Sequence, residues 1–324
     1  FYYWLYSFIA LVSITAMESW STAHAVGARN IITKSVSVKS FTKIRTSCGI
    51  DVYFTPKASG APEVTIKAPE NIMSEIDVTV KNDELVIGIT KTNKKRIINT
   101  GDTKVIVKAA GVNGFSATSS GDIYIESDIS HSKVLNLAAS SSGDIHAKNI
   151  SAPAMNLAAS SSGDISLYNC NGNTLNIASS SSGDIEVKKV TVITCNVAGS
   201  STGDTDIKEC SVNTLNITSS SSADIKVHNS TDATDINIVA SSTSSVELPS
   251  TTAGTISITA SSGSEIEISG TAKKCIIKAS SGAEIDLTEL KAGSGIAQSS
   301  SGASINVHDV DDYTVSKSSG GSVD

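Results

Sequence analysis

Residues 175–187 read LNIASSSSGDIEV, and the same phrase returns along the chain at a nearly fixed interval. The aspartate of each copy marks its position, and the steps between successive aspartates are 22 residues once and 20 residues thereafter. The markers are Asp122, Asp144, Asp164, Asp184, Asp204 and Asp224, followed in the same phase by Ser245, Glu265, Glu284 and Ser304. A self-similar period of about 20 residues indicates a protein built from stacked repeats.

Apolar and polar residues alternate on both sides of the serines. Ile185, Glu186 and Val187 follow the marker, and Leu175 and Ile177 flank a polar residue before it. A period of two is typical of a strand with one buried face, so each repeat is expected to hold two short strands. Such a unit cannot bury its apolar side alone, but stacked coils can. The sequence therefore predicts an all-β fold, a right-handed parallel β-helix (a β-solenoid) with coils of about 20 residues and rungs about 4.8 Å apart.

Three sections follow from the composition along the chain. Residues 1–25 are an apolar run and a polar stretch ending in Ala23-His24-Ala25, the small-x-small pattern of a cleaved signal peptide. An uncleaved membrane anchor is the alternative. Residues 26–115 are rich in strand patterns but irregular, and are expected to form coils that cap one end, because an open solenoid end is an exposed sheet edge. Residues 116–324 carry the regular β-helix repeats.

Charge separates the last two sections. Residues 26–115 hold 14 Lys and Arg against 8 Asp and Glu, a balance of +6, whereas residues 116–324 hold 11 Lys, no Arg and 23 Asp and Glu, a balance of −12. Binding to nucleic acid depends on Lys and Arg contacts with phosphates, so no nucleic-acid partner is expected. No long apolar run follows the leader, so no membrane span is expected in the mature chain. The mature chain is expected to be exported, to the periplasm, the cell surface or the medium.

The five cysteines show no metal-ligand spacing. Four of them fall in two columns of the repeat that also hold Ile, Val or Leu, and they are expected to be buried as small apolar side chains. The four are Cys170, Cys195, Cys210 and Cys275.

The Ser-Gly-Asp phrase does not fit a catalytic site. A nucleophilic serine needs a base within hydrogen-bond reach, and no set of Ser, His and Asp recurs along the repeat. A polysaccharide lyase or hydrolase needs paired carboxylates, usually with a basic group and aromatic platforms. The repeats contain no Arg and few aromatic residues. No catalytic residue and no cofactor is therefore assigned.

Aspartates stacked about 4.8 Å apart would repel one another, which leaves two interpretations of their column. Calcium could bridge the carboxylates in a ladder over Asp122, Asp144, Asp164, Asp184, Asp204 and Asp224, since oxygen ligands suit Ca²⁺. Alternatively, the aspartates accept hydrogen bonds from N–H groups of the corner. The second is favoured, because the corner stays polar where Ser245 and Ser304 replace the carboxylate. The preceding glycine is expected to supply the unusual backbone angle of the corner.

A column of asparagines runs through the strand that precedes the serines. Each lies between two apolar residues, so its side chain is expected to face outward in a hydrogen-bonded ladder. These residues form the candidate interaction face: Asn136, Asn156, Asn176, Asn196 and Asn216.

The chain resembles a known family in several stretches. They are APENI at 68–72, LVIGI at 85–89 and the repeated SSSGDI. Together they are similar to the putative auto-transporter adhesin, head GIN domain family, over roughly residues 36–324. The resemblance implies a pectin-lyase-like β-helix, export and an adhesive role, and it brings no catalytic residues.

These observations predict an exported, non-enzymatic β-helix that presents a stacked polar face to a protein or glycan at a cell surface. The alternative is an extracellular polysaccharide-active or carbohydrate-binding β-helix. The pattern does not specify an oligomeric state.

Overall fold

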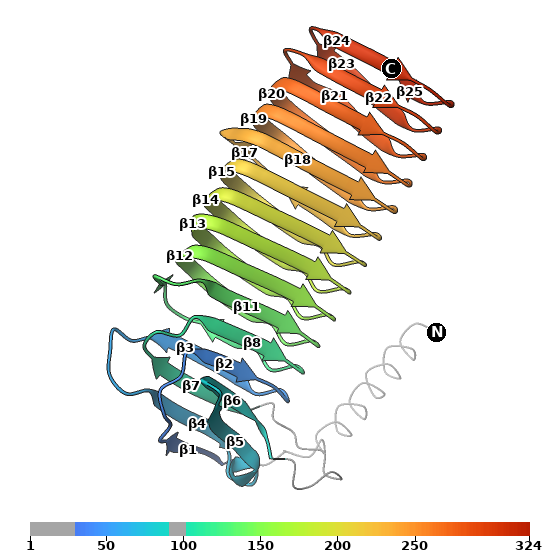
Figure 1. The fold of residues 1–324 in the computed structure, drawn as a ribbon. Helices are drawn as coiled ribbons and strands as arrows, with labels where there is room; N and C mark the ends of the chain where they lie inside the picture. The colour runs from blue at the N-terminus through green and yellow to red at the C-terminus, as the bar shows by residue number, and fades with distance from the viewer. Residues whose placement is uncertain (1–29, 91–101) are drawn as a thin grey trace, which may run out of the picture.

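A computed structural model describes residues 30–90 and 102–324. The chain winds into a rod of stacked coils with the amino-terminal strands at one end (Figure 1). The strands form one continuous sheet whose successive coils pair in parallel. Within the described ranges the only helical element is the short 3-10 helix η1 (Met73–Glu75). The predicted parallel β-solenoid with coils of about 20 residues is confirmed. The leader, residues 1–25, lies outside the described residues.

The regular coils differ in one respect from the expected pair of strands. The middle coils are single strands of 16 residues, as in β13 (Ile165–Ser180). Inward residues follow a step of two, but the step lengthens to three at two places, between Leu167 and Cys170 and between Gly172 and Leu175. The strand therefore bends twice, and it pairs in register on both sides of each bend because the same bends recur in the next coil.

The remaining strands of the coils have the following bounds. They are β8 (Gly114–Thr118), β9 (Ile123–Ile125), β10 (Ile129–Ser130), β11 (Leu135–Ser140), β12 (Ile145–Ser160), β14 (Ile185–Ser200), β15 (Thr205–Ser220), β16 (Asp224–Val227), β17 (Ser230–Thr231), β18 (Ala233–Ser241), β19 (Ser245–Ser261), β20 (Glu265–Ala279), β21 (Glu284–Ala292), β22 (Gly295–Ser299), β23 (Ser304–Val310), β24 (Tyr313–Lys317) and β25 (Ser322–Val323).

The amino-terminal section begins the stack and then closes its end. Its strands are β1 (Ile31–Val36), β2 (Lys43–Thr46), β3 (Asp51–Pro56), β4 (Glu63–Pro69), β5 (Ile76–Lys81), β6 (Glu84–Ile89) and β7 (Lys104–Ala109). Strands β2 and β3 pair in parallel with β8 and β9, so they form the first coil. The intervening β4–β7 stack beyond them, and the pairs β1–β4, β4–β7 and β5–β6 are antiparallel. This change of direction ends the regular stacking.

The serine corners turn on two consecutive residues in the left-handed region. In the corner 181–184, Ser181 has φ 51° and Ser182 has φ 62°. Gly183 is not in that region, so the expectation that this glycine supplies the unusual angle is wrong. Its reason is space: a Cβ on Gly183 would lie 2.3 Å from the backbone nitrogen of Ser160 in the preceding coil. Glycine therefore allows two coils to approach closely at the corner.

The core is a continuous column of aliphatic side chains along the rod. In one coil, Ile185, Val187 and Val197 are buried, and each lies beside its counterpart in the adjacent coils. Burial of such a side chain stabilises the fold by about 1.5–3 kcal/mol. The predicted burial of Cys170, Cys195, Cys210 and Cys275 is confirmed. Burial raises the pKa of the Cys170 thiol to about 12 and that of Cys275 to about 11, so both stay protonated at neutral pH.

Replacing Gly183 with alanine tests the close approach at the corner. We expect Gly183→Ala to lower the free energy of unfolding by about 1–3 kcal/mol, because the methyl group meets backbone atoms that cannot move aside. The matched variant is Ala283→Gly, at the same place in a later corner where alanine is already accommodated, and it should cost only about 0.5–1 kcal/mol. Denaturant unfolding measures both, and an unchanged stability in Gly183→Ala would contradict the account.

Candidate functional site

The aspartates of the corners form a column in which each carboxylate serves the next coil. Asp184 Oδ1 accepts a hydrogen bond from the backbone N–H of Asp204 at 3.0 Å, and Asp164 Oδ1 accepts one from Asp184 at 2.9 Å. The same contact links Asp122 to Asp144, Asp144 to Asp164 and Asp204 to Asp224. The carboxylate thus replaces a missing bond of the backbone ladder.

Further along the rod the backbone makes this bond itself. The N–H of Ser245 donates to the carbonyl of Ala223 at 3.1 Å, and the N–H of Glu265 donates to the carbonyl of Ser244 at 2.9 Å. In these coils the residue before the marker is alanine or serine rather than glycine, and the strand begins at the marker. The carboxylate is therefore not needed there, which explains why serine and glutamate occupy the later markers.

Two carboxyl groups of the corners have a raised pKa. Burial raises the pKa of Asp204, the backbone N–H of Asp224 opposes the rise, and the neighbouring carboxylates of Asp224 and Asp184 add to it. Burial also raises the pKa of Asp51. Because the fold raises the pKa of these two carboxyl groups, their ionisation lowers the free energy of unfolding. This loss develops as the pH rises from the ordinary pKa of an aspartate to the raised one. Within the described ranges, no three His, Cys, Asp or Glu side chains are grouped as metal ligands.

Two aspartates of the same column differ in whether they accept a backbone N–H from the next coil. Comparing them tests whether this hydrogen bond stabilises the corner. Asp184→Ala removes the acceptor of the Asp204 N–H, so we expect a loss of about 1–2 kcal/mol in the free energy of unfolding. Asp224→Ala should stay within about 0.5 kcal/mol, because the next N–H is bound by a backbone carbonyl instead. Equal losses in the two variants would contradict this role.

The calcium ladder remains a prediction, and thermal melting of the unmodified chain tests it. If Ca²⁺ bridges the carboxylates, EDTA should lower the melting temperature of the unmodified chain and added Ca²⁺ should restore it. An unchanged melting temperature in both conditions would remove the calcium interpretation.

The asparagines form a hydrogen-bonded ladder along one side of the coils. The Nδ2 group of each residue donates to Oδ1 of its counterpart in the preceding coil, at 2.8 Å from Asn156 through Asn216. Asn237 extends the ladder at 2.9 Å. Sequence reasoning missed Asn237 because an extra residue in that coil shifts the spacing to 21.

The surface around this ladder is uncharged from Asn136 to Asn216, and Asp235 is the first charged residue beside it, in the coil of Asn237. The next outward column holds the exposed alanines Ala138, Ala158, Ala178 and Ala198. No charged residue occurs in the strand segments that build this surface, which are 135–140, 154–160, 174–180, 194–200 and 214–220. The Asn face is defined here as the asparagine column from Asn136 to Asn237 with this alanine column.

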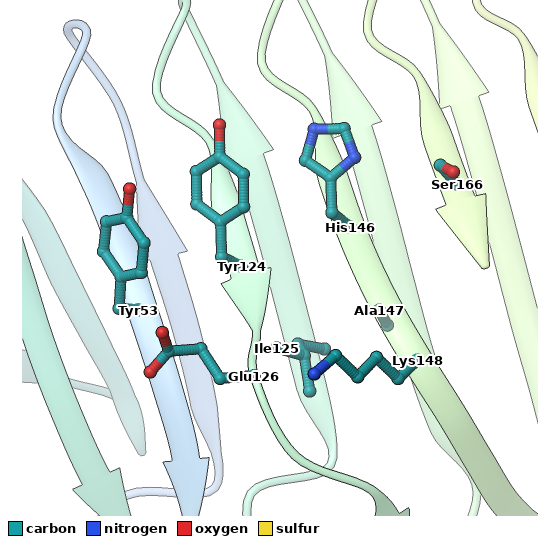
Figure 2. A pocket seen from close by; sticks show the side chains of 8 residues that line it. All are labelled: Tyr53, Tyr124, Ile125, Glu126, His146, Ala147, Lys148 and Ser166. Atoms are coloured by element: carbon teal, nitrogen blue, oxygen red, sulfur yellow. The ribbon is translucent and has the colours of Figure 1, made fainter. Parts of the chain in front are cut away.

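A second surface lies on another arm of the coil, the strand segment that follows the serine corner, next to the amino-terminal cap. Tyr53, Tyr124 and His146 occupy one column and stack ring on ring, with centroids 4.9 and 5.0 Å apart and planes 17° and 19° apart (Figure 2). We call these three residues the aromatic row. It borders a pocket of about 320 Å³ whose lining also includes Ile125, Glu126, Ala147, Lys148 and Ser166.

The two ends of the aromatic row differ. At the Tyr53 end, the Lys104 ammonium lies 5.4 Å from the ring centroid. The Tyr124 hydroxyl donates to Asp122 at 3.3 Å, and burial together with the Asp122 and Asp51 carboxylates raises its pKa to about 12. At the other end, His146 is followed in the column by the small Ser166. One ring face of His146 is therefore not covered by an aromatic neighbour.

Sequence reasoning missed the aromatic row. The cap strands β4–β7 lie between Tyr53 and Tyr124 in the sequence, and the register brings the two residues side by side. The available signal was the match between DVYF at 51–54 and DIYI at 122–125. Asp51 also belongs to the Asp column, because its Oδ1 accepts from the N–H of Asp122 at 3.4 Å.

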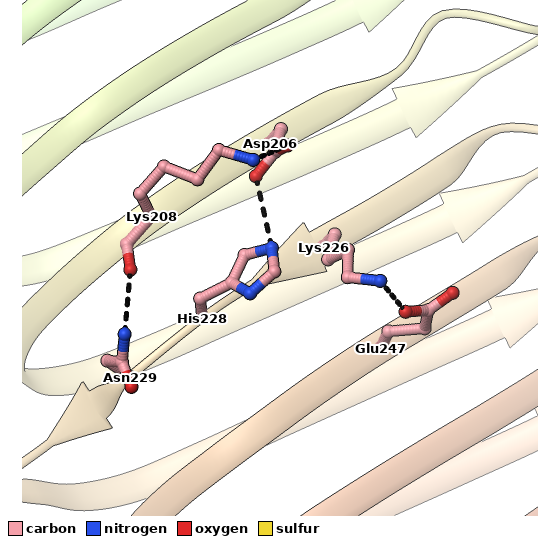
Figure 3. Close-up of polar contacts among 6 residues, drawn as sticks. All are labelled: Asp206, Lys208, Lys226, His228, Asn229 and Glu247. Atoms are coloured by element: carbon pink, nitrogen blue, oxygen red, sulfur yellow. Dashed lines mark hydrogen bonds and ion pairs between the residues drawn. The ribbon is translucent and has the colours of Figure 1, made fainter.

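Further along the same arm, charged residues pair with one another. Asp206 contacts Lys208, and its Oδ1 lies 3.4 Å from Nε2 of His228 (Figure 3). Lys226 pairs with Glu247, and this contact raises the pKa of the lysine. Such exposed pairs contribute only about 0–1 kcal/mol each. These carboxylates lie on an open strand surface and not in the pocket, whose lining contains a single carboxylate, that of Glu126.

Solved structures share the fold of this chain. One, described as a putative adhesin from Parabacteroides merdae, has a TM-score of 0.61 at 14% identity and covers 74% of this chain and 96% of its own. A putative adhesin from Parabacteroides distasonis has a TM-score of 0.57 at 17% identity, covering 76% and 97%. A putative adhesin from Bacteroides fragilis has a TM-score of 0.50 at 22% identity, covering 74% and 97%. These identities support the fold alone. No curated protein matches the chain.

A family model matches the sequence twice, over residues 40–231 and 210–324. The two matches together include the first coil, most of the cap and all of the regular coils. The chain therefore belongs to the putative auto-transporter adhesin, head GIN domain family.

Proposed function

We propose that this protein is an exported, non-enzymatic adhesion protein whose Asn face is the contact surface. Its family is described as adhesin heads, and the three solved structures compared above are described as putative adhesins. The partner is a protein or a glycan at a cell surface. No helix in the described ranges has the length and apolar character needed to cross a membrane.

The Asn face is the observation that carries this proposal. Within the ladder, each side-chain amide uses one N–H and one oxygen lone pair for its hydrogen bonds to the adjacent coils. Its second N–H and second lone pair remain available to a partner. These groups repeat about every 4.8 Å along the rod. The ladder holds every amide in one orientation, so little side-chain entropy remains to be lost on binding. A rigid, repeated array of this kind suits a partner that is itself extended.

The uncharged surroundings of the ladder support a contact role. Lysines and carboxylates occur on the arm with the aromatic row and the ion pairs, but are absent from the Asn face between residues 135 and 220. Depletion of charge is typical of the buried centre of an interface. The exposed alanines leave the backbone close to the surface, so a partner can lie flat against the strands.

A lysine on the Asn face should block attachment. Beads coated with the purified chain are expected to adhere to cultured cells, and Ala178→Lys should reduce adhesion at least tenfold, because an unpaired charge would be buried in the contact. The matched control is Thr191→Lys, on an exposed site outside the Asn face, which should adhere like the unmodified chain. Adhesion that resists Ala178→Lys, or no adhesion by the unmodified chain, would contradict the proposal.

Export is tested through the leader. If residues 1–25 are a signal peptide, the mature chain should begin at Val26, since cleavage follows the small-x-small pattern at Ala23 and Ala25. Amino-terminal sequencing of the exported chain checks this, and replacing both alanines with arginine should leave the leader attached. A chain that remains in the cytoplasm with residues 1–25 intact would contradict export.

A further inference from the structure

The pocket beside the aromatic row has features that the rest of the rod lacks. Its column is aromatic at Tyr53, Tyr124 and His146, then changes to Ser166 and Glu186 in the following coils. The rings project from the strands and lie parallel to one another (Figure 2). The small Ser166 therefore leaves an open slot beside the His146 ring at the end of the aromatic row, and Ser166 lines the pocket there.

The floor of the slot is recessed. Ala147 lines the pocket and is the smallest residue of its inward column, where its neighbours are Ile125 and Leu167. It is 8% exposed, compared with 2% for Ile125 and 3% for Leu167. A methyl group in place of a branched side chain therefore lowers the surface at the point where the aromatic row ends.

Two opposite charges border the pocket without a partner. Figure 2 shows Glu126 and Lys148 beside the aromatic row, with Lys148 reaching back over Ile125. Neither side chain forms an ion pair with any residue in the described ranges, in contrast to Asp206 and Glu247. A hydrogen-bond acceptor and a donor thus stand within one pocket next to an open aromatic face.

We propose that this pocket binds a neutral pyranose sugar, stacked on the open face of His146 in the slot above Ser166. A pyranose presents an apolar C–H face to a ring and hydroxyl groups at its edge, which matches an aromatic wall flanked by a carboxylate and an ammonium group. The volume lies at the small end of the range for ligand pockets, about 300–1,000 Å³. One sugar unit with an exit into solvent fits this shape.

The local charge favours a neutral sugar over an acidic one. Lys148 is the only cation in the pocket lining, and Glu126 lies in the same lining. Asp122 stands beside the row, where its carboxylate accepts from Tyr124. A sugar carboxylate on the His146 face would therefore meet two carboxylates against the one ammonium group of the lining, because Lys104 lies at the other end of the row, over Tyr53. This site lies on a different side of the coil from the Asn face, so it does not depend on the proposed adhesive contact.

Saturation-transfer NMR with the full chain and methyl glycosides of glucose, galactose, mannose and N-acetylglucosamine tests the proposal. At least one of these should bind with a dissociation constant on the order of 1 mM, with transfer to its ring C–H protons. His146→Ala should weaken binding at least tenfold by removing the stacking face. Ser166→Tyr should abolish it, because a further ring would continue the row and fill the slot.

The controls separate loss of the site from loss of the fold. Asn306→Tyr places the same new ring in the same column near the far end of the rod, and it should bind like the unmodified chain. Circular dichroism melts should show that the His146 and Ser166 variants remain folded. No transfer from any of the four glycosides, or binding unaffected by Ser166→Tyr, would overturn the proposal. Binding of glucuronic acid in preference to the four would overturn the assignment of a neutral sugar.

Discussion

The whole structure depends on in-register parallel stacking, in which each side chain stands about 4.8 Å from its own counterpart in the next coil. The residues at equivalent positions of adjacent coils must therefore be able to pack against each other or to form hydrogen bonds with each other. Aliphatic side chains meet this condition in the core, and asparagine meets it on the surface because its amide is both donor and acceptor. Aspartate meets it by accepting a backbone N–H from the next coil. Glycine at the corner meets it by having no side chain.

The repeat in the sequence was sufficient to predict the solenoid, the buried cysteines and the asparagine ladder, because each depends only on the period and on which residues alternate. Features that depend on backbone angles were not predictable in this way. The left-handed region is occupied by Ser181 and Ser182 and not by Gly183, a choice that a repeated Ser-Ser-Gly cannot reveal. The two bends inside β13 were also missed, since inward and outward residues alternate on both sides of each.

The aromatic row shows a second limit of reading a repeat from its sequence. Tyr53 belongs to the first coil, but the cap strands separate it from Tyr124, so the two belong to one column only after the chain has folded. Tyr53 comes from the irregular section, whereas Tyr124 and His146 come from the first regular coils, so the row lies where the two sections meet. A uniform face suits an extended partner, whereas the row and its pocket suit a single small ligand. The two proposed contacts thus have different structural origins in one rod.

The central claim is the register, and a cross-coil disulfide measures it directly. Ala158 and Ala178 are exposed and directly paired in adjacent coils, so cysteines at both sites fall within the Cα separation that a disulfide spans. The account predicts that the Ala158→Cys, Ala178→Cys double variant forms this bond under mild oxidation, seen as a linked peptide by mass spectrometry. The pair Ala158→Cys, Ala198→Cys lies two rungs, about 9.6 Å, apart and should not link. Equal linkage of the two pairs would contradict the stacking on which the account rests.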